Sequence, residues 1–314
     1  MIFRITLAMA MGLQLFLLPA VTAENAGSPA PASGCDSSKN HDRWYLSDLE
    51  CSPQSTQISL LANISRENVK HGQASLLGNI ALENVERFQL AGTFNYARHV
   101  RGAQIAYNIN IAKTVHGFQL GGVNIADSIK GTQIGALNIS RHLNGNGIGF
   151  LTLAKNGLLH LDVSAEETGM SKLRFASGRN FFTSYSYGYT FDSRNHPFSL
   201  GMGFGYHKDF GKAFLEGELG YNLILDEHTD LDQLDDEEES LGNSDFRHNS
   251  LFQAGIRAGM EVWGNFHIFG GLTYNSLITH GNEKLMASWN DDLTAESEGD
   301  YRWPGLEIGI RFGR

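Results

Sequence analysis

A repeat of 14 to 16 residues dominates the first half of the chain. Glutamine recurs at spacings of 16, 16, 15, 15 and 14 residues, and an asparagine follows each glutamine. Helical-hairpin repeats need about 34 residues and propeller blades about 40, so this region cannot form either fold. The glutamines are Gln57, Gln73, Gln89, Gln104, Gln119 and Gln133, and the asparagines are Asn63, Asn79, Asn95, Asn110, Asn124 and Asn138.

A period this short suits one small coil, or one strand with its turn. In a parallel stack of coils, identical residues lie about 4.8 Å apart, so that their side-chain amides can form ladders. We therefore predict a short β-solenoid over residues 57–154, with the Gln and Asn columns as ladders. An antiparallel meander with one strand per repeat is the alternative. Asn63 and Asn138 also begin Asn-Ile-Ser sequons, which we interpret as ladder positions and not as glycosylation sites.

The second half of the chain shows strict alternation of apolar residues with small or polar ones. Between residues 198 and 206, Phe, Leu, Met, Phe and Tyr alternate with Ser and Gly, and residues 252–262 and 306–313 repeat the pattern. Period two with one apolar face is typical of a β-strand. Eight such strands are predicted, at about 157–166, 170–178, 181–191, 196–206, 212–225, 249–262, 265–279 and 302–313.

The lengths of these strands and of their connections favour a membrane barrel. Most of the strands are long enough to cross a bilayer at a tilt. Two long loops, about 226–248 and 280–301, fall on the same side of the sheet, whereas short turns join strands on the other side. Outer-membrane barrels combine short periplasmic turns with long outer loops. A soluble barrel or sandwich with its aromatic residues inside is the alternative.

The expected fold is therefore all-β: a short repeat β-solenoid followed by an eight-stranded antiparallel outer-membrane-type β-barrel. We expect the barrel domain to occupy residues 155–314. Four aromatic residues near strand ends, Trp263, Phe266, Tyr301 and Trp303, are predicted to form girdles at the membrane interface.

The non-apolar strand faces carry charges of both signs. Side chains fill the interior of an eight-stranded barrel, so we expect these charges to pair there as a plug. A catalytic carboxylate cluster is the competing interpretation. The residues are His160, Asp162, Glu166, Lys172, Arg174, Glu216, Glu218, Gln253, Arg257, Glu261, Glu307 and Arg311.

Residues 1–23 are typical of a secretory signal peptide. Arg4 precedes an apolar run, and small residues surround a cleavage position predicted after Ala23. The following residues, 24–56, are rich in Ser, Ala, Pro and Asn and are interpreted as a linker. This linker holds Cys35 and Cys51, which we predict to form one disulfide in an exported chain. The signal peptide and the barrel pattern together predict an outer-membrane location.

The formal net charge of −10 has a local origin, because residues 226–248 contribute −9 and residues 280–302 contribute −4. We interpret both segments as solvated acidic loops, with capture of divalent cations as the alternative. The run of acidic residues within 226–248 lacks the glycine and the spacing of an EF-hand loop. The weak candidate ligands are Asp230, Asp232, Asp235, Asp236 and Glu237.

The sequence offers no convincing catalytic motif. It has no Gly-x-Ser-x-Gly, His-Glu-x-x-His or phosphate loop, and no cofactor is expected. An acidic chain without a basic run is not expected to bind nucleic acid. We therefore expect a non-enzymatic protein that contacts outer-membrane lipid and has a structural or interaction role. A barrel-embedded lipid-acting or proteolytic enzyme, with its site at the outer rim, and a narrow pore are the alternatives.

The repeat resembles that of the surface-repeat outer-membrane proteins of Gram-negative bacteria, whose units run roughly Gly-x-Gln-x-Gly-x-x-Asn. The segments 154–157 and 176–182 are also similar to that family's passage out of its repeats, so the resemblance covers about residues 57–190. It implies an exported envelope protein and carries no assigned activity. The matching positions are Gly117, Gln119, Gly121 and Asn124, followed by Gly131, Gln133, Gly135 and Asn138.

Overall fold

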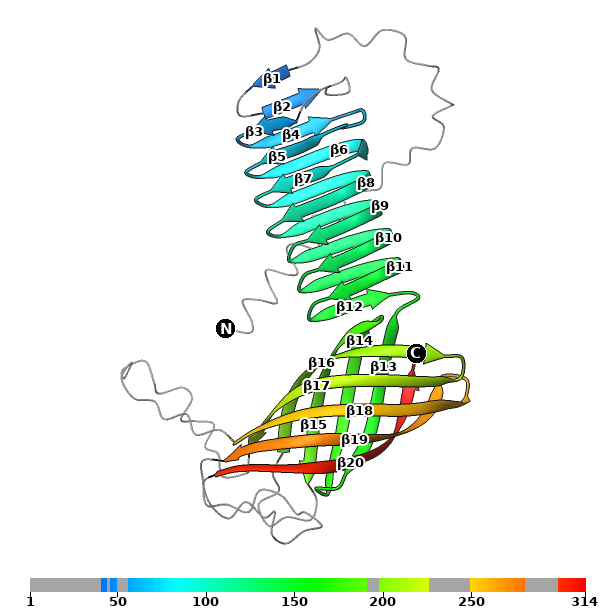
Figure 1. Cartoon of the computed structure of the whole chain (residues 1–314). Helices are drawn as coiled ribbons and strands as arrows, with labels where there is room; N and C mark the ends of the chain where they lie inside the picture. Colours follow the sequence, from blue (N-terminus) through cyan, green and yellow to red (C-terminus); the bar gives the residue numbers. More distant parts are fainter. Residues whose placement is uncertain (1–40, 44–45, 50–55, 191–197, 226–248, 280–298) are drawn as a thin grey trace, which may run out of the picture. The chain divides into compact units, whose positions relative to one another are not determined.

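The computed structural model describes residues 41–43, 46–49, 56–190, 198–225, 249–279 and 299–314. These residues form a parallel β-solenoid and, after it in the chain, a closed antiparallel β-barrel (Figure 1). The predicted fold class is therefore confirmed. In the described part of the chain, no helix has the length and hydropathy of a membrane span.

Twelve strands build the solenoid sheet. They are β1 (His41–Arg43), β2 (Leu46–Leu49), β3 (Gln57–Ser59), β4 (Ala62–Ser65), β5 (Gly72–Ser75), β6 (Gly78–Val85), β7 (Phe88–Ala91), β8 (Phe94–Ala106), β9 (Ile109–Leu120), β10 (Val123–Ile134), β11 (Leu137–Ile148) and β12 (Leu151–Ala154).

The coils stack in parallel, with each residue beside its counterpart one repeat away. Asn124 of β10 pairs with Asn110 of β9 on one side and with Asn138 of β11 on the other. In the described part of the solenoid, every strand pairing from β2 to β12 is parallel, and β1 pairs antiparallel with β2. The antiparallel meander is therefore wrong, and the solenoid prediction is confirmed.

The asparagine side chains form a hydrogen-bonded ladder through the solenoid interior. Each Nδ2 donates to the Oδ1 of the asparagine in the following coil, at 2.8 to 3.0 Å. The last of them, Asn138, donates to Thr152 Oγ1 at 3.3 Å. Each amide also donates to a backbone carbonyl across the coil, as Asn110 does to Leu120 O at 2.8 Å. Both sequon asparagines, Asn63 and Asn138, are fully buried within this ladder.

The glutamine side chains form a second ladder with the opposite direction of donation. Each Nε2 donates to the Oε1 of the glutamine in the preceding coil, at 2.7 to 2.9 Å. At the N-terminal end, Gln57 donates to Ser47 Oγ at 3.2 Å. At the other end, Gly147 occupies the next position, and the buried Gln133 Oε1 has no donor among the described residues.

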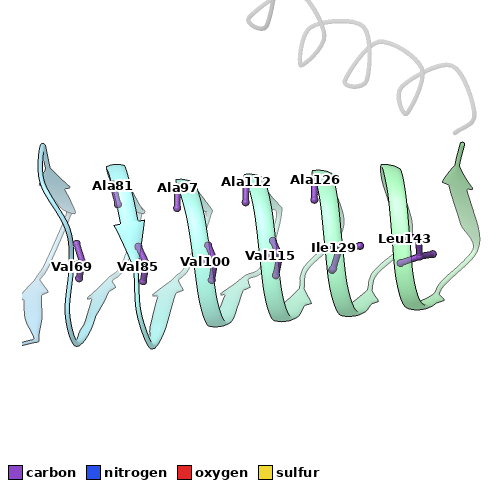
Figure 2. Packing of buried hydrophobic residues seen from close by; sticks show 10 residues of the cluster. All are labelled: Val69, Ala81, Val85, Ala97, Val100, Ala112, Val115, Ala126, Ile129 and Leu143. Carbon is purple, nitrogen blue, oxygen red and sulfur yellow. The ribbon is translucent and has the colours of Figure 1, made fainter. Parts of the chain in front are cut away.

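Two apolar columns fill the rest of the solenoid interior, and Figure 2 shows them as parallel rows. One row is alanine and the other contains β-branched residues and leucine. Stacked residues of one type keep the coil cross-section constant, which explains why the repeat is visible in the sequence. The rows are Ala81, Ala97, Ala112 and Ala126, and Val69, Val85, Val100, Val115, Ile129 and Leu143.

A glycine column marks one corner of the later coils. Gly102, Gly117, Gly131 and Gly145 have φ between 123° and 153°, a region that side-chain-bearing residues rarely adopt. A Cβ on Gly131 would also overlap the carbonyl of Gly117 in the preceding coil. Glycine is therefore needed at this corner of the later coils for two reasons: the backbone conformation and the short distance to the preceding coil.

Eight strands close the barrel, and β13 pairs with β20 to complete it. Two-residue turns at 179–180, 211–212 and 264–265 lie at one end, the short-turn end, where β13 also begins and β20 ends. The connections 167–169, 191–197, 226–248 and 280–298 belong to the opposite, long-connection end. The strands are β13 (Leu158–Glu166), β14 (Met170–Gly178), β15 (Phe181–Thr190), β16 (Phe198–Phe210), β17 (Ala213–Leu225), β18 (Asn249–Trp263), β19 (Phe266–Thr279) and β20 (Gly299–Gly313).

Candidate functional site

The barrel wall is apolar outside and charged inside. Alternation along each strand turns successive side chains to opposite faces. In β20, Leu306 and Ile308 are 51% and 71% exposed, whereas Glu307 between them is 4% exposed. The same holds around the barrel for outward residues such as Leu219 and Ile256, which are 70% and 61% exposed. The alternative of a barrel with an apolar, aromatic interior is therefore wrong.

The interior charges form a connected lattice of ion pairs inside the barrel. Arg311 of β20 donates to Asp162 of β13 at 2.8 Å from Nε, and to Glu216 of β17 at 2.7 Å from both Nη atoms. Arg174 of β14 reaches the same two carboxylates, Asp162 at 2.5 Å and Glu216 at 3.0 Å, and also contacts Glu218. Two guanidinium groups and two carboxylates thus neutralise each other away from water.

Arg257 extends this lattice toward the long-connection end, and a separate ion pair between Lys172 and Glu166 lies beyond it. Arg257 of β18 donates to Glu218 at 2.5 Å and to Glu307 at 2.5 Å. Lys172 donates to Glu166 at 2.5 Å and to Gln253 Oε1 at 3.0 Å. Buried charges persist only when paired and hydrogen-bonded. The ion-paired lattice connects five strands across the lumen, β13, β14, β17, β18 and β20.

The structure brings most of the predicted inward residues into this lattice or against it. His160 is buried beside it, with Nε2 at 3.5 Å from Asp162 Oδ2. Glu261 differs, because it is half-buried and lines a hollow at the short-turn end. The predicted pairing of opposite charges is therefore what the barrel interior contains.

Inward-facing glycines provide the space for this lattice. A Cβ on Gly203 of β16 would overlap Glu218 Oε1 and Ser184 Oγ, and one on Gly305 of β20 would overlap Glu167 Oε1. The other two glycines of residues 201–205 have different neighbours: a Cβ on Gly201 would overlap Asn222 and Ser186, and one on Gly205 would overlap Phe182. Each of these positions in β16 therefore lacks the space for a side chain.

An apolar cluster lines the long-connection end of the lumen. It contains Met170, Ile224, Leu251, Leu277 and Trp303, with Tyr301 packed against it. Trp303 Nε1 donates to Glu167 Oε1 at 2.7 Å. The prediction that Tyr301 and Trp303 form an outer girdle is therefore wrong: both share the strand face of Glu307 and Arg311 and point inward. Trp263 is 83% exposed at the short-turn end, and Phe266 packs on Phe312 at 5.2 Å.

A polar hollow of about 600 Å³ opens at the short-turn end. His207 lies in it, with Nδ1 at 2.8 Å from Glu216 Oε1 and Nε2 at 2.8 Å from Asp209 Oδ1. The Phe214 ring separates His207 from His267 and lies 4.1 Å from Arg311 Cζ. Among the described residues that line the hollow, the titratable side chains include His207, Asp209, Glu261 and His267, and none of these lining residues is a serine, threonine or cysteine.

Other predicted sites lie outside the described residues. These are the disulfide candidates Cys35 and Cys51, and the acidic run with Asp230, Asp232, Asp235, Asp236 and Glu237. Within the described ranges, no group of three or more His, Cys, Asp or Glu side chains is arranged to hold a metal ion. Comparison with protein-family models, curated proteins and solved structures finds no match to this chain.

Proposed function

We propose that the protein is an exported outer-membrane protein whose eight-stranded barrel spans the bilayer and which has a structural or interaction role. The observation that carries the proposal is the wall of the barrel, which is apolar outside and ion-paired inside. In water this arrangement would expose a continuous apolar surface, which soluble monomers rarely do. In lipid it is the expected arrangement, because the closed barrel satisfies every strand edge.

Strand length and connection length support the same proposal. The barrel strands have 9 to 15 residues, and a transmembrane strand needs about 9–11. The short-turn end matches the periplasmic side of outer-membrane barrels. On this proposal the solenoid, which precedes β13, is periplasmic and the acidic connections 226–248 and 280–298 face outward. The signal peptide of residues 1–23 would supply export.

Cell fractionation tests the location, and protease treatment of intact cells tests the orientation. We expect the protein in the outer-membrane fraction, released by detergent only, with a heat-modifiable band on gels. Recovery as a soluble periplasmic protein without detergent would refute the membrane proposal. Cleavage within residues 57–146 on intact cells would refute the orientation but not the membrane location.

The interior lattice argues against the narrow-pore alternative. Because Arg174 and Arg311 pair with carboxylates of other strands across the interior of a narrow eight-stranded barrel, we expect silence in single-channel recordings of the full chain. Steady conductance from the wild-type chain would refute this expectation. For the enzyme alternative, alanine substitution of His207 with an assay on outer-membrane lipids is the direct test, although the hollow lies at the short-turn end and not at the outer rim.

A further inference from the structure

The surface of the solenoid is divided between charge-free and charged segments. Residues 57–154 contain eight Lys or Arg, four Asp or Glu and four His, and all sixteen lie in the segments that lead from an Asn to the next Gln position. The opposite segments pass through the coil turn between Gln and Asn, and they contain no Lys, Arg, Asp, Glu or His. We call these opposite segments the charge-free edge: 57–65, 72–81, 88–97, 103–112, 118–126, 132–140 and 146–154.

The side chains on the outside of the charge-free edge are mostly aliphatic or aromatic. Each buried ladder residue is followed by an outward residue, which gives two apolar columns in register from coil to coil. The turn residues add to them, with Tyr107 at 83% and Leu76 at 60% exposed. The columns are Ile64, Ile80, Tyr96, Ile111, Ile125, Ile139 and Leu153, and Ile58, Ala74, Leu90, Ile105, Leu120, Ile134 and Ile148.

The backbone of this edge is hydrogen-bonded even at the turns. Thr93 N donates to Leu77 O at 2.9 Å in the preceding coil, and Gly122 N donates to Tyr107 O at 3.0 Å. Leu151 N continues the series by donating to Ala136 O at 3.0 Å. Contact with hydrocarbon requires that backbone polar groups be satisfied internally. Ordinary loops fail this condition, whereas several N–H groups in the stacked turns of this solenoid donate to carbonyls of the neighbouring coil.

Net positive charge borders the charge-free edge. Residues 57–154 carry a formal net charge of +4, although the whole chain carries −10. Arg98 pairs with Glu83 and Arg141 with Asp127, both at 3.1 Å. The excess of cations beside an apolar surface is the combination that binds bilayers containing anionic lipid.

We propose that the charge-free edge of the solenoid lies in the interfacial region of a bilayer that contains anionic phospholipid. The inference rests on the proposed function, because a barrel in the membrane holds the solenoid close to that bilayer. Only residues 155–157 separate β12 from β13, a span of at most about 11 Å. The apolar columns contact acyl chains near the headgroups, and the net positive charge of the adjoining segments attracts the anionic surface of the bilayer.

Photocrosslinking of the full chain tests this inference. We would place p-benzoylphenylalanine at Tyr107 on the charge-free edge, at Lys113 on the charged surface of the same coil region, and at Ile256 on the outer wall of the barrel. Each protein is reconstituted into vesicles of phosphatidylethanolamine and phosphatidylglycerol, irradiated, and analysed by mass spectrometry for lipid adducts. We expect adducts at positions 107 and 256 and background at position 113.

The other outcomes are decisive in different ways. Adducts at position 256 without adducts at 107 would overturn this inference and leave the membrane barrel intact. Absence of adducts at both positions would overturn the proposed function as well. Crosslinking of position 107 to a second copy of the chain would also overturn the inference, because the edge would then be a dimer interface.

A matched pair of variants gives a second test. Leu90 and Leu82 are both 47% exposed, but only Leu90 lies on the charge-free edge. We expect Leu90→Glu to reduce lipid adducts at position 107 by a factor of about two to five, because a charge on a lipid-facing surface costs about 0–1 kcal/mol near the interface. Leu82→Glu should leave the adducts unchanged. Equal effects of the two substitutions would overturn the inference, and adducts at position 256 report that both proteins are inserted.

Discussion

The asparagine ladder can be tested by converting one amide into a carboxyl group of the same size. Asn110 is fully buried and accepts a hydrogen bond from Asn95 Nδ2 at 2.9 Å. Its own Nδ2 donates to Asn124 Oδ1 at 3.0 Å and to Leu120 O at 2.8 Å. Asn110→Asp keeps the shape of the side chain, but it replaces the Nδ2 donor with a carboxyl oxygen. This oxygen then faces two other acceptors, Asn124 Oδ1 and Leu120 O. The neighbouring Asn108, which is exposed in the coil turn, provides a control through Asn108→Asp.

The expected magnitude follows from the two lost donor contacts. A buried acceptor left without its donor costs about 1–3 kcal/mol, so two of them destabilise the local structure by about 3 kcal/mol or more. Ionisation of the buried carboxyl group would add to this cost. Because about 1.4 kcal/mol corresponds to a factor of ten, the opening equilibrium of the surrounding coils should rise by about 100-fold.

Hydrogen exchange followed by mass spectrometry measures this opening locally in the full chain. Peptides that cover β9 and β10 should lose about two orders of magnitude of protection in Asn110→Asp and none in Asn108→Asp, while barrel peptides keep theirs. Equal protection in the two variants would refute the argument that the ladder stabilises the solenoid. Uniform loss across solenoid and barrel would show that the effect is not local to the coils.

Three further substitutions test the barrel and the coil corner. Arg311→Met leaves carboxylates unpaired inside the barrel, so we expect the free energy of unfolding to fall by about 3–5 kcal/mol. The folded, heat-modifiable band on gels should also become weaker. An unchanged denaturant midpoint would contradict this expectation. Gly203→Ala should also lower the yield of folded barrel, because its Cβ would overlap Glu218, whereas Gly217→Ala, with open space around it, should fold normally. Gly131→Ala should lower the melting temperature of the solenoid, because φ is 145° there.

The inner and outer faces of the barrel wall were predictable because they depend only on the sequence of each single strand. Period-two alternation assigns each side chain to one face before any strand partner is known, and Asp162, Arg174 and Arg311 were predicted inward on that basis. The same parity also places Tyr301 and Trp303 on the face of Arg311. The girdle prediction used only their position near a strand end, and it was wrong for that reason.

Strand ends were less predictable than strand faces. The apolar alternation of β16 stops at Tyr206, but the strand continues to Phe210. Gly211, with φ of 74°, permits a two-residue turn, so backbone pairing runs on through Lys208 and Asp209 to the turn. Backbone hydrogen bonds do not depend on side-chain polarity, and hydropathy patterns therefore underestimate the length of such hairpins.

The repeat predicted which residues lie above one another, but the ladder polarity required the structure. Gln and Asn have the same amide group, and nothing in the sequence indicates that one column donates forward and the other backward. The way in which the two ladders end was also not predictable from the sequence. Thr152 accepts the hydrogen bond from the last asparagine, whereas Gly147 leaves Gln133 Oε1 without a partner among the described residues. The partners of residues far apart in the sequence, such as Asp162 and Arg311, likewise emerge only from closure of the barrel.

The two ladders make the number of coils an adjustable property of this architecture. In each coil, the asparagine donates a hydrogen bond to the following coil and the glutamine donates one to the preceding coil. The coil also accepts one such hydrogen bond from each of its two neighbours. Removing or duplicating a whole coil therefore leaves every remaining amide with the same kind of partner. Among the described residues, the contacts with Ser47, Ser59 and Thr152 are specific to an end. Because the two amide columns point in opposite directions, their dipoles also oppose each other, so a longer stack would gain length without accumulating a field along its axis.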